Sequence, residues 1–290
     1  RQNRIVIANR LAKSRGIPIS DNINSFPSGY SKNQQDVIIA AFYSAYTGSD
    51  PNKVSLNSIK NIPIPNWNIR YTGLMNNKSI RKLFNRFSIS HGYRSSYTIN
   101  QFQSNLDYIQ SQPEQKNQYG DYLSEILFGN INLVEQFNPL IRLDIELKNS
   151  LKILTELKTD RALSLSLDNN ILTETRGDEY IFGLGYRLKD IPFTTNIGGR
   201  RKTMKGDLNI KADLSYRDNI TVLRSLNVDN NQVTAGQTLW SIKVTADYML
   251  SRNLTALFFY DHNFSKFAIS TAFPQTSIRS GISIQYNFGN

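Results

Sequence analysis

The chain has no cysteine, only two histidines and no long hydrophobic run. Without cysteine it has neither a disulfide framework nor a thiolate metal site, which suits a protein that folds across an oxidising periplasm. Its longest apolar run, Val37 to Tyr43, is far shorter than the roughly 20 residues that a membrane-spanning helix needs. Any segment that crosses a bilayer must therefore be a β-strand.

The remaining composition is compatible with both a water-soluble protein and a membrane barrel. Of the 290 residues, 39% are hydrophobic, and the mean hydropathy is −0.41. A transmembrane barrel has such values because only every second residue of each strand faces lipid. The chain begins at Arg1 without an initiator methionine or a signal peptide, so we expect a fragment whose C-terminus is genuine.

The first 66 residues differ in pattern from the rest. Arg4 to Lys13 and Gln34 to Tyr46 have helical composition, and glycines and prolines separate them. The second of these helices is amphipathic, which leaves two interpretations: it packs on its own protein, or it binds a membrane surface or a partner. We interpret residues 1–66 as a helical and loop segment that is separate from the strands.

From residue 67 to residue 290 the apolar residues recur with a period of two, which indicates strands. We count about nine, with a long loop over residues 100–139. The candidate strands lie near residues 67–72, 87–99, 141–147, 151–167, 172–188, 208–222, 240–250, 254–264 and 278–288. Several reach the roughly 9–11 residues that a tilted strand needs to cross a bilayer.

The turn lengths between these strands bring apolar residues to one face, as hairpins require. We predict three such pairings from the turns alone. They are Trp240 with Phe264 across residues 251–253, Ile145 with Ile153 across residues 148–150, and Ile153 with Tyr186 across residues 168–171. The agreement of three turns favours antiparallel neighbours throughout.

Aromatic residues occupy the apolar parity near the strand ends, which is typical of the interfacial girdles of a membrane barrel. The candidate girdle residues are Trp240, Tyr248, Tyr260, Tyr180 and Tyr186. The last strand ends on Tyr286 and Phe288, and we interpret this aromatic end as the signal that barrel assembly recognises. A β-sandwich also shows such alternation, but it rarely needs many consecutive long strands with rings at their ends.

Charged residues of both signs occupy the opposite parity, as a water-filled lumen would require. The candidate lumen-facing residues are Arg142, Asp144, Glu146, Lys152, Glu156, Lys243, Asp247 and Arg279. We therefore predict an antiparallel all-β transmembrane β-barrel in residues 67–290, with residues 1–66 outside its wall.

One hairpin is too long for the apolar band. Four leucines on the apolar parity, Leu163, Leu165, Leu167 and Leu172, lie beyond a charged stretch that includes Arg161 and Glu174. Charges facing lipid are costly at the midplane and inexpensive at the interface. We therefore expect the leucine tip to rise past the outer leaflet and to pack on protein, either the 100–139 loop or a partner barrel.

Four segments carry a family resemblance, and the stretches PNW…YTGL and SHGYRS are its most specific parts. The segments are residues 34–74, 87–106, 164–189 and 273–290. They resemble the C-terminal part of the SprA/Sov family, the giant outer-membrane translocons of the type IX secretion system. Family members are much longer than this chain, so the resemblance implies one sector of a very large barrel rather than a complete one.

The resemblance also implies a function and partners. It implies a passive, protein-conducting pore in the bacterial outer membrane, through which folded cargo with a C-terminal targeting domain reaches the cell surface. A PorV-type barrel partner would cover a lateral opening, and a periplasmic plug protein would close the pore. The wall would contact the lipid bilayer and the remainder of its own barrel. Gliding motility is associated with some members.

Other functional classes find little support. His91 and His262 lie on the apolar parity, as packing or girdle residues do, and Gly183-Leu-Gly185 lacks the third glycine of a dinucleotide site. We therefore expect no enzyme activity, no cofactor and no metal.

The basic residues, which give a formal charge of +11, form no stripe interleaved with exposed aromatics, so we expect no nucleic acid partner. An outer-membrane porin or small-molecule transporter and a soluble surface adhesin with a β-sandwich remain the alternatives.

Two basic clusters account for part of the positive charge. They are Lys78, Arg81, Lys82 and Arg86, and Arg200, Arg201, Lys202 and Lys205. If the last strand ends in the periplasm, strand alternation places both clusters in periplasmic turns. There they either are solvated or contact acidic headgroups or an acidic partner.

Overall fold

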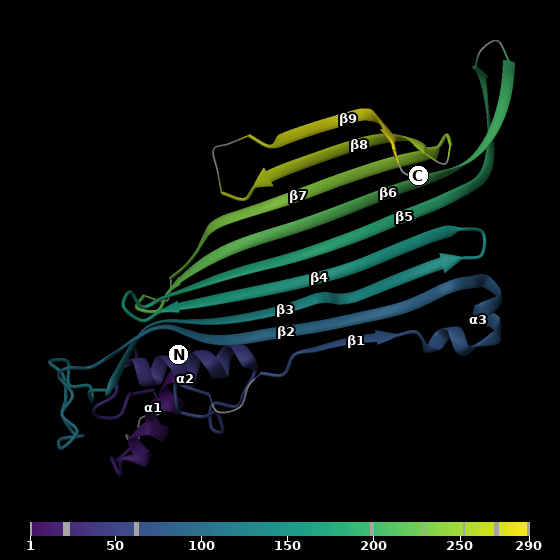
Figure 1. Ribbon diagram of the computed structural model, residues 1–290. Helices are drawn as coiled ribbons and strands as arrows, with labels where there is room; N and C mark the ends of the chain where they lie inside the picture. The colour runs from purple at the N-terminus through teal and green to yellow at the C-terminus, as the bar shows by residue number, and fades with distance from the viewer. Residues whose placement is uncertain are drawn as a thin grey trace.

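A computed structural model describes residues 2–19, 24–60, 64–197, 200–228, 230–251, 253–269 and 273–288. These residues form one antiparallel sheet of nine strands whose spatial order follows the sequence (Figure 1). The strands are β1 (Trp67–Tyr71), β2 (Phe84–Ser104), β3 (Ile126–Leu147), β4 (Leu151–Ser166), β5 (Ile171–Ile197), β6 (Arg200–Ser225), β7 (Asn230–Met249), β8 (Leu254–Phe267) and β9 (Gln275–Tyr286). The mostly β, antiparallel fold and the count of nine are confirmed.

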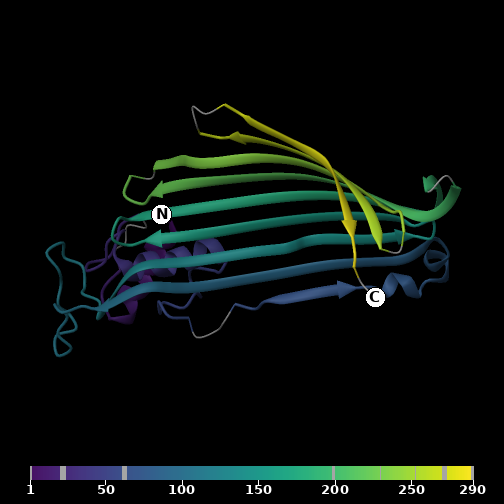
Figure 2. The same ribbon diagram turned by 45° about the horizontal axis from the view of Figure 1, so that its top comes forward.

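The sheet does not close into a barrel. Within the described residues β1 pairs only with β2 and β9 pairs only with β8, so each has an edge without a neighbouring strand. The sheet twists along its width, and β8 and β9 are turned relative to β3 and β4 (Figure 2). The described residues thus form an open, twisted sheet, and the barrel expected for residues 67–290 is not seen in them.

Helices precede the sheet and interrupt its start. The two expected helices are confirmed as α1 (Gln2–Ser14) and α2 (Gln35–Thr47). The short helices η1 (Gly73–Asn76) and α3 (Lys78–Leu83), between β1 and β2, were not predicted. The side chain of Asn77 caps α3 by accepting a hydrogen bond from the amide of Ser79. No helix in the described ranges is long and apolar enough to cross a membrane.

Both ends of the loop predicted over residues 100–139 are wrong. Strand β2 continues to Ser104 and β3 begins at Ile126, so the connection covers only residues 105–125. The period of two is obscured in the sequence, because the β2–β3 register shifts near Ile99 and Gln101 and because position 129 is a glycine. In the structure, apolar side chains of this region such as Phe128 and Ile131 are buried under α2.

Two of the three predicted registers are confirmed. Trp240 pairs with Phe264, and Ile145 pairs with Ile153. The third register is wrong by two residues, because Ile153 pairs with Leu184 rather than Tyr186. The turn occupies residues 167–170 instead of 168–171, and Asn170 closes it in the left-handed conformation with φ of 52°. A shift of two leaves every side chain on its expected face.

The two ends of the sheet differ in their connections. At the end where β9 finishes, the β3–β4, β5–β6 and β7–β8 connections contain only two to four residues. Helix α3 and the start of β6 also lie at this end (Figure 1), so both basic clusters are at the end where β9 finishes. They belong to a helix and to strands rather than to the turns that we expected. The side chains of Arg200, Arg201 and Lys202 lie outside the described residues. The opposite end has α1, α2 and the 105–125 connection (Figure 1).

The largest hydrophobic core lies between α2 and the end of the sheet. Ile38, Ile39 and Phe42 of α2 pack against apolar side chains of three strands. Those side chains are Phe128, Ile131 and Leu133 of β3, Leu163 and Leu165 of β4, and Leu172 of β5. The leucine tip therefore packs on protein as expected, but mainly on α2, and α2 packs on its own chain rather than on a separate partner.

Helix α1 forms a second layer on α2. Ile7 packs with Ala40, Ala41 and Val54, and Ala8 of α1 is fully buried in a neighbouring cluster. Asp36, in the first turn of α2, accepts a hydrogen bond of 2.8 Å from the hydroxyl of Ser124. Burial raises the pKa of this carboxyl above its usual value, and the Ser124 contact opposes the rise. Because the pKa of Asp36 is raised in the folded state, loss of its proton at neutral pH lowers the stability of the folded state relative to acid pH.

Leu165→Ala tests this core. The side chain is 1% exposed, so removing it is expected to lower the free energy for opening of α2 by about 2–5 kcal/mol. Amide hydrogen exchange in α2, measured on the assembled complex extracted in detergent, detects this loss. The matched control is Leu184→Ala, at a side chain that is 40% exposed outside the core, and it should leave α2 unchanged. Equal acceleration of exchange by both variants would contradict the packing described.

Candidate membrane-facing surface

Side chains alternate between two faces of very different chemistry. We call the face that carries Leu157, Phe182 and Ile242 the apolar face, and the opposite one the polar face. Residues that pair across neighbouring strands point to the same face of the sheet. The apolar face therefore extends from Leu157 to its partner Tyr180, and from Tyr180 to its partner Tyr216. Helix α2 covers the apolar face only at one end, through Leu163 and its neighbours.

The rest of the apolar face is uncovered. Ile282 is 75% exposed, and many other large apolar side chains on this face are exposed as well. They include Ile69, Ile141, Tyr180, Phe182, Leu184, Tyr186, Leu214, Trp240, Ile242, Phe258, Ile278 and Ile284. Water-soluble monomers rarely expose a contiguous apolar patch of more than a few hundred Å². This face therefore requires a nonaqueous covering.

Aromatic side chains form a row along one border of this face. Tyr180, Tyr216 and Trp240 are cross-strand neighbours whose ring centroids lie 6.1 and 4.7 Å apart, and Phe264 extends the row. On β1 to β3 the row continues through Trp67, whose ring centroid lies 4.5 Å from that of Tyr93. Of the predicted girdle residues, Trp240 and Tyr180 belong to this row. With Phe137 of β3, whose ring centroid lies 4.8 Å from that of Tyr93, the structure brings together rings from seven strands that the sequence pattern treats separately.

A second border lies toward the other end of the strands. Tyr248 of β7 and Tyr286 of β9 are on the apolar face, and the Tyr248 hydroxyl donates a 2.9 Å hydrogen bond to the Ile191 carbonyl. Trp240 and Tyr248 are eight residues apart, or about 27 Å along a strand. At the roughly 35–45° tilt of barrel strands this length spans about 19–22 Å of height, somewhat less than the lipid-facing band of about 25 Å. Tyr186 lies toward this border.

Tyr260 is not a border residue, which corrects the expectation for this side chain. It pairs with Val244, midway between Trp240 and Tyr248. His91 lies among the rings of the first row, with its ring centroid 5.9 Å from that of Phe137. His91 is thus a packing residue. The described residues contain no group of three or more His, Cys, Asp and Glu side chains that could hold a metal ion.

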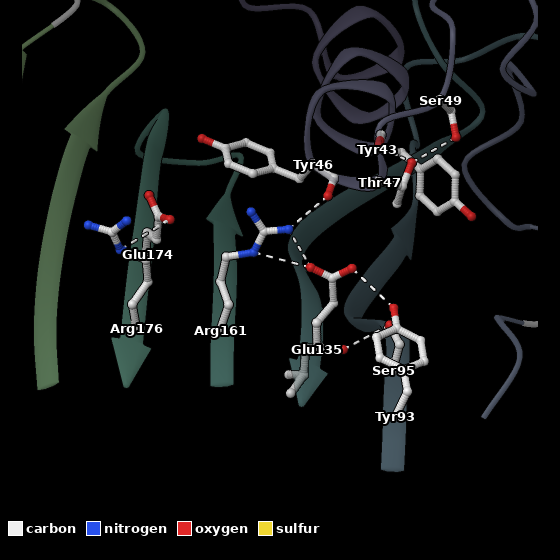
Figure 3. A network of polar contacts seen from close by, with 11 residues as sticks. Tyr43, Tyr46, Thr47, Ser49, Tyr93, Ser95, Glu135, Arg161, Glu174 and Arg176 are labelled. Atoms are coloured by element: carbon white, nitrogen blue, oxygen red, sulfur yellow. Dashed lines mark hydrogen bonds and ion pairs between the residues drawn. The ribbon is translucent and has the colours of Figure 1, made fainter. Parts of the chain in front are cut away.

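Charged residues lie along the strands between the aromatic row and the core beneath α2. Figure 3 shows four of them, Glu135, Arg161, Glu174 and Arg176. Arg161 binds the carboxylate of Glu135 and donates a 2.9 Å hydrogen bond to the carbonyl of Tyr46 in α2. The Tyr93 hydroxyl donates to the same carboxylate at 3.1 Å. We call the five residues Glu135, Arg161, Glu174, Arg176 and Arg224 the charged belt. It links the edge of the apolar band to the C-terminal turn of α2.

The polar face carries the side chains predicted to line a lumen. Arg142 donates to Asp144 at 3.0 Å and to Glu156 at 3.1 Å, and the Arg279 guanidinium lies 2.7 Å from Asp261. Other contacts on this face join Lys152 to Glu146 at 4.0 Å and Asn209 to Asp247 at 2.7 Å, and Lys243 lies opposite Asp261. All eight predicted residues share this face. Acidic and basic groups alternate there, so charges are compensated locally.

The aromatic end of the chain departs from its expected strand. Strand β9 ends at Tyr286, two residues before Phe288. Phe288 is 93% exposed, and its ring centroid lies 4.7 Å from that of Tyr286. The two rings therefore form a pair at the end of the last strand, and only the first belongs to the sheet.

No protein-family model matches this chain, and no curated protein matches it significantly.

Arg161→Leu tests the charged belt. This substitution leaves Glu135 without its cation and removes the bond to Tyr46, so we expect the docking of α2 to weaken by about 1.5–3 kcal/mol. Arg176→Leu is the matched control, because Arg176 has only a 3.9 Å contact with Glu174 and is largely exposed. Limited proteolysis should cleave residues 24–60 faster in the first variant alone. Identical cleavage rates would mean that the belt does not hold α2.

Proposed function

We propose that this chain is one sector of the wall of a protein-conducting translocon in the bacterial outer membrane, of the type IX secretion kind. The apolar face would contact lipid, and the polar face would line a wide lumen. The observation that carries the proposal is a single-layer sheet with one exposed apolar face and one exposed polar face. An aromatic row borders the apolar face on one side and separate tyrosines lie at its other border, as in interfacial girdles.

Other coverings of the apolar face fit less well. A β-sandwich adhesin needs a second sheet, whereas the described residues form one sheet. A sandwich core also has no need for aromatic rows followed by a charged belt. A bilayer needs both features, because rings favour the interface and charged groups are tolerated only at or beyond it.

The connections support an orientation. Membrane barrels of the outer membrane have short periplasmic turns and longer extracellular loops. Three of the four connections at the end where β9 finishes have two to four residues, whereas the longest connection, residues 105–125, lies at the opposite end. The end where β9 finishes, with α3, would therefore face the periplasm. The 105–125 connection, α1 and α2 would lie at the cell surface.

The charge pattern favours a translocon over a porin. An ion-selective pore concentrates one sign of charge at a constriction, whereas ion pairs such as Arg142–Asp144 and Arg279–Asp261 leave this face locally balanced. The resemblance to the SprA/Sov family supports the same choice.

The partners follow from the proposal. The unpaired edges of β1 and β9 would hydrogen-bond to the remainder of the same barrel. Secreted cargo with a C-terminal targeting domain would pass the polar face. A PorV-type barrel partner and a periplasmic plug protein are proposed from the resemblance alone.

Closure provides the first test of this function. Expressed alone and refolded in detergent, residues 1–290 are expected not to form a closed, heat-modifiable barrel, because both sheet edges lack partners. We expect aggregation through those edges and no discrete conductance in planar bilayers. A conducting, heat-modifiable monomer of this chain alone would support the porin alternative instead.

The end of the chain provides a second test. Phe288→Asp places a charge where an interfacial ring is expected and should impair insertion of the complete wall. Asn287→Asp changes the neighbouring residue to the same side chain and should be tolerated. Outer-membrane levels and secretion of a reporter cargo are expected to fall several-fold for the first variant only. Equal effects of the two variants would reject Phe288 as part of the assembly signal.

A further inference from the structure

Helix α3 carries an exposed basic patch at one end of the sheet. Lys78, Arg81 and Lys82 are all exposed, and we call these three residues the α3 cluster. Within the described residues no ion pair includes any of them. The charged belt differs, because each of its three arginines has a glutamate partner. The positive charge of α3 is therefore uncompensated by the described part of the chain.

The sequence explains this lack of carboxylates. It has neither aspartate nor glutamate between Asp50 and Asp107, a range that includes the whole of α3. Across the sheet, Glu146 lies opposite Arg86 on the polar face and contacts Lys152 at 4.0 Å. Arg86, the fourth residue of the basic cluster seen in the sequence, therefore belongs to the polar face. The three helix cations remain for a ligand of opposite charge.

Helix α3 lies at the depth where the apolar face ends. Strand β2 begins at Phe84, directly after α3, and Phe84 is nine residues from Tyr93 of the aromatic row. On β7, the two borders of the apolar face are eight residues apart, at Trp240 and Tyr248. The ring centroid of Phe84 lies 5.6 Å from that of Phe87, which is on the apolar face opposite Ile145. The start of β2 is thus at the second border.

The exposed apolar surface continues from β1 toward the α3 cluster. Ile69 and Tyr71 of β1 are on the apolar face and are 55% and 53% exposed. Leu83, the last residue of α3, is 64% exposed. Its carbonyl accepts a 3.1 Å hydrogen bond from the amide of Lys148, which fixes the end of α3 beside the β3–β4 turn. This turn adds a further exposed cation and no carboxylate.

We propose that the α3 cluster binds the headgroups of acidic phospholipids, in the leaflet that borders this end of the sheet. The inference rests on the proposed function, because it requires the apolar face to contact a bilayer. Headgroups lie directly beyond the apolar band of a bilayer, at the depth of α3. Basic side chains beside an exposed leucine suit such an interface, where the leucine contacts acyl chains and the cations contact phosphates.

An acidic protein is a poorer fit for this patch. It would neutralise the cations, but the exposed apolar residues of β1 and α3 continue the band that is proposed to face lipid. One bilayer would cover this apolar surface and compensate the charge at its border. A protein bound to α3 is therefore an outcome that the experiment must distinguish.

Quenching of a fluorophore by labelled lipids tests the proposal on the assembled complex in phosphatidylcholine vesicles. Single labels at Ser79→Cys in α3 and at Ile242→Cys on the apolar face are placed in this cysteine-free chain. The vesicles contain increasing fractions of nitroxide-labelled phosphatidylglycerol or phosphatidylcholine. At Ser79 we expect half-maximal quenching at an at least about fivefold lower fraction of phosphatidylglycerol, the effect of one cation near an acidic surface. At Ile242 both lipids should quench equally.

The double variant Lys78→Gln, Lys82→Gln should remove the preference for phosphatidylglycerol at Ser79. Salt at about 1 M should remove it as well, since the Debye length is then about 3 Å. The matched control is Lys13→Gln with Lys53→Gln. These two exposed lysines also have no ion pair within the described residues, and they belong to α1 and to the segment after α2. The control removes the same net charge and should keep the preference.

Equal quenching by the two lipids at Ser79 would overturn the proposal, as would a preference that survives the α3 double variant. Absence of quenching by either lipid at Ser79 would overturn it too and would indicate that protein covers α3. The Ile242 label reports separately on the proposed function. No quenching there would reject the membrane-facing surface, whereas quenching there without a preference at Ser79 would reject only the lipid site.

Discussion

The structure depends on one constraint: a single-layer sheet exposes both of its faces, so each face must suit its own surroundings. Apart from register shifts such as the one between Phe137 and Ile141, side chains alternate along the strands, and the pairings from β3 to β9 keep most residues of the apolar face opposite one another. A slip of one residue in any strand would place its ion pairs among apolar side chains. The ladder hydrogen bonds hold the sheet together, while the surroundings on each side determine which register is stable.

The same constraint explains why the N-terminal helices are present on the apolar face. Strands β3, β4 and β5 extend beyond the aromatic row, and their leucines would otherwise be exposed to water. Helix α2 covers those leucines, and the charged belt fills the boundary between the helix and the uncovered band (Figure 3). The apolar face is thus divided into a part that protein covers and a part that requires another covering.

Much of this arrangement could be predicted from local pattern. The period of two located the strands, and the short turns predicted the pairing of Trp240 with Phe264 because tight hairpins couple register to turn length. The turn after β4 was misplaced, since only the left-handed Asn170 shows where it closes. The contact between Arg161 and Tyr46 could not be foreseen, because the two residues are far apart in sequence and meet only when α2 docks. Tyr260 was misplaced because parity identifies a face but not a depth along the strand.

The central claim is that the two faces of β7 lie in different solvents. Nitroxide labels placed singly at each position from 239 to 249, in the assembled complex in lipid, measure this directly through collisions with oxygen and with a water-soluble nickel chelate. The account predicts a period of two, with oxygen access highest at even positions such as Ile242 and nickel access highest at odd positions such as Lys243. Oxygen and nickel access that rise and fall together, or show no period, would contradict it.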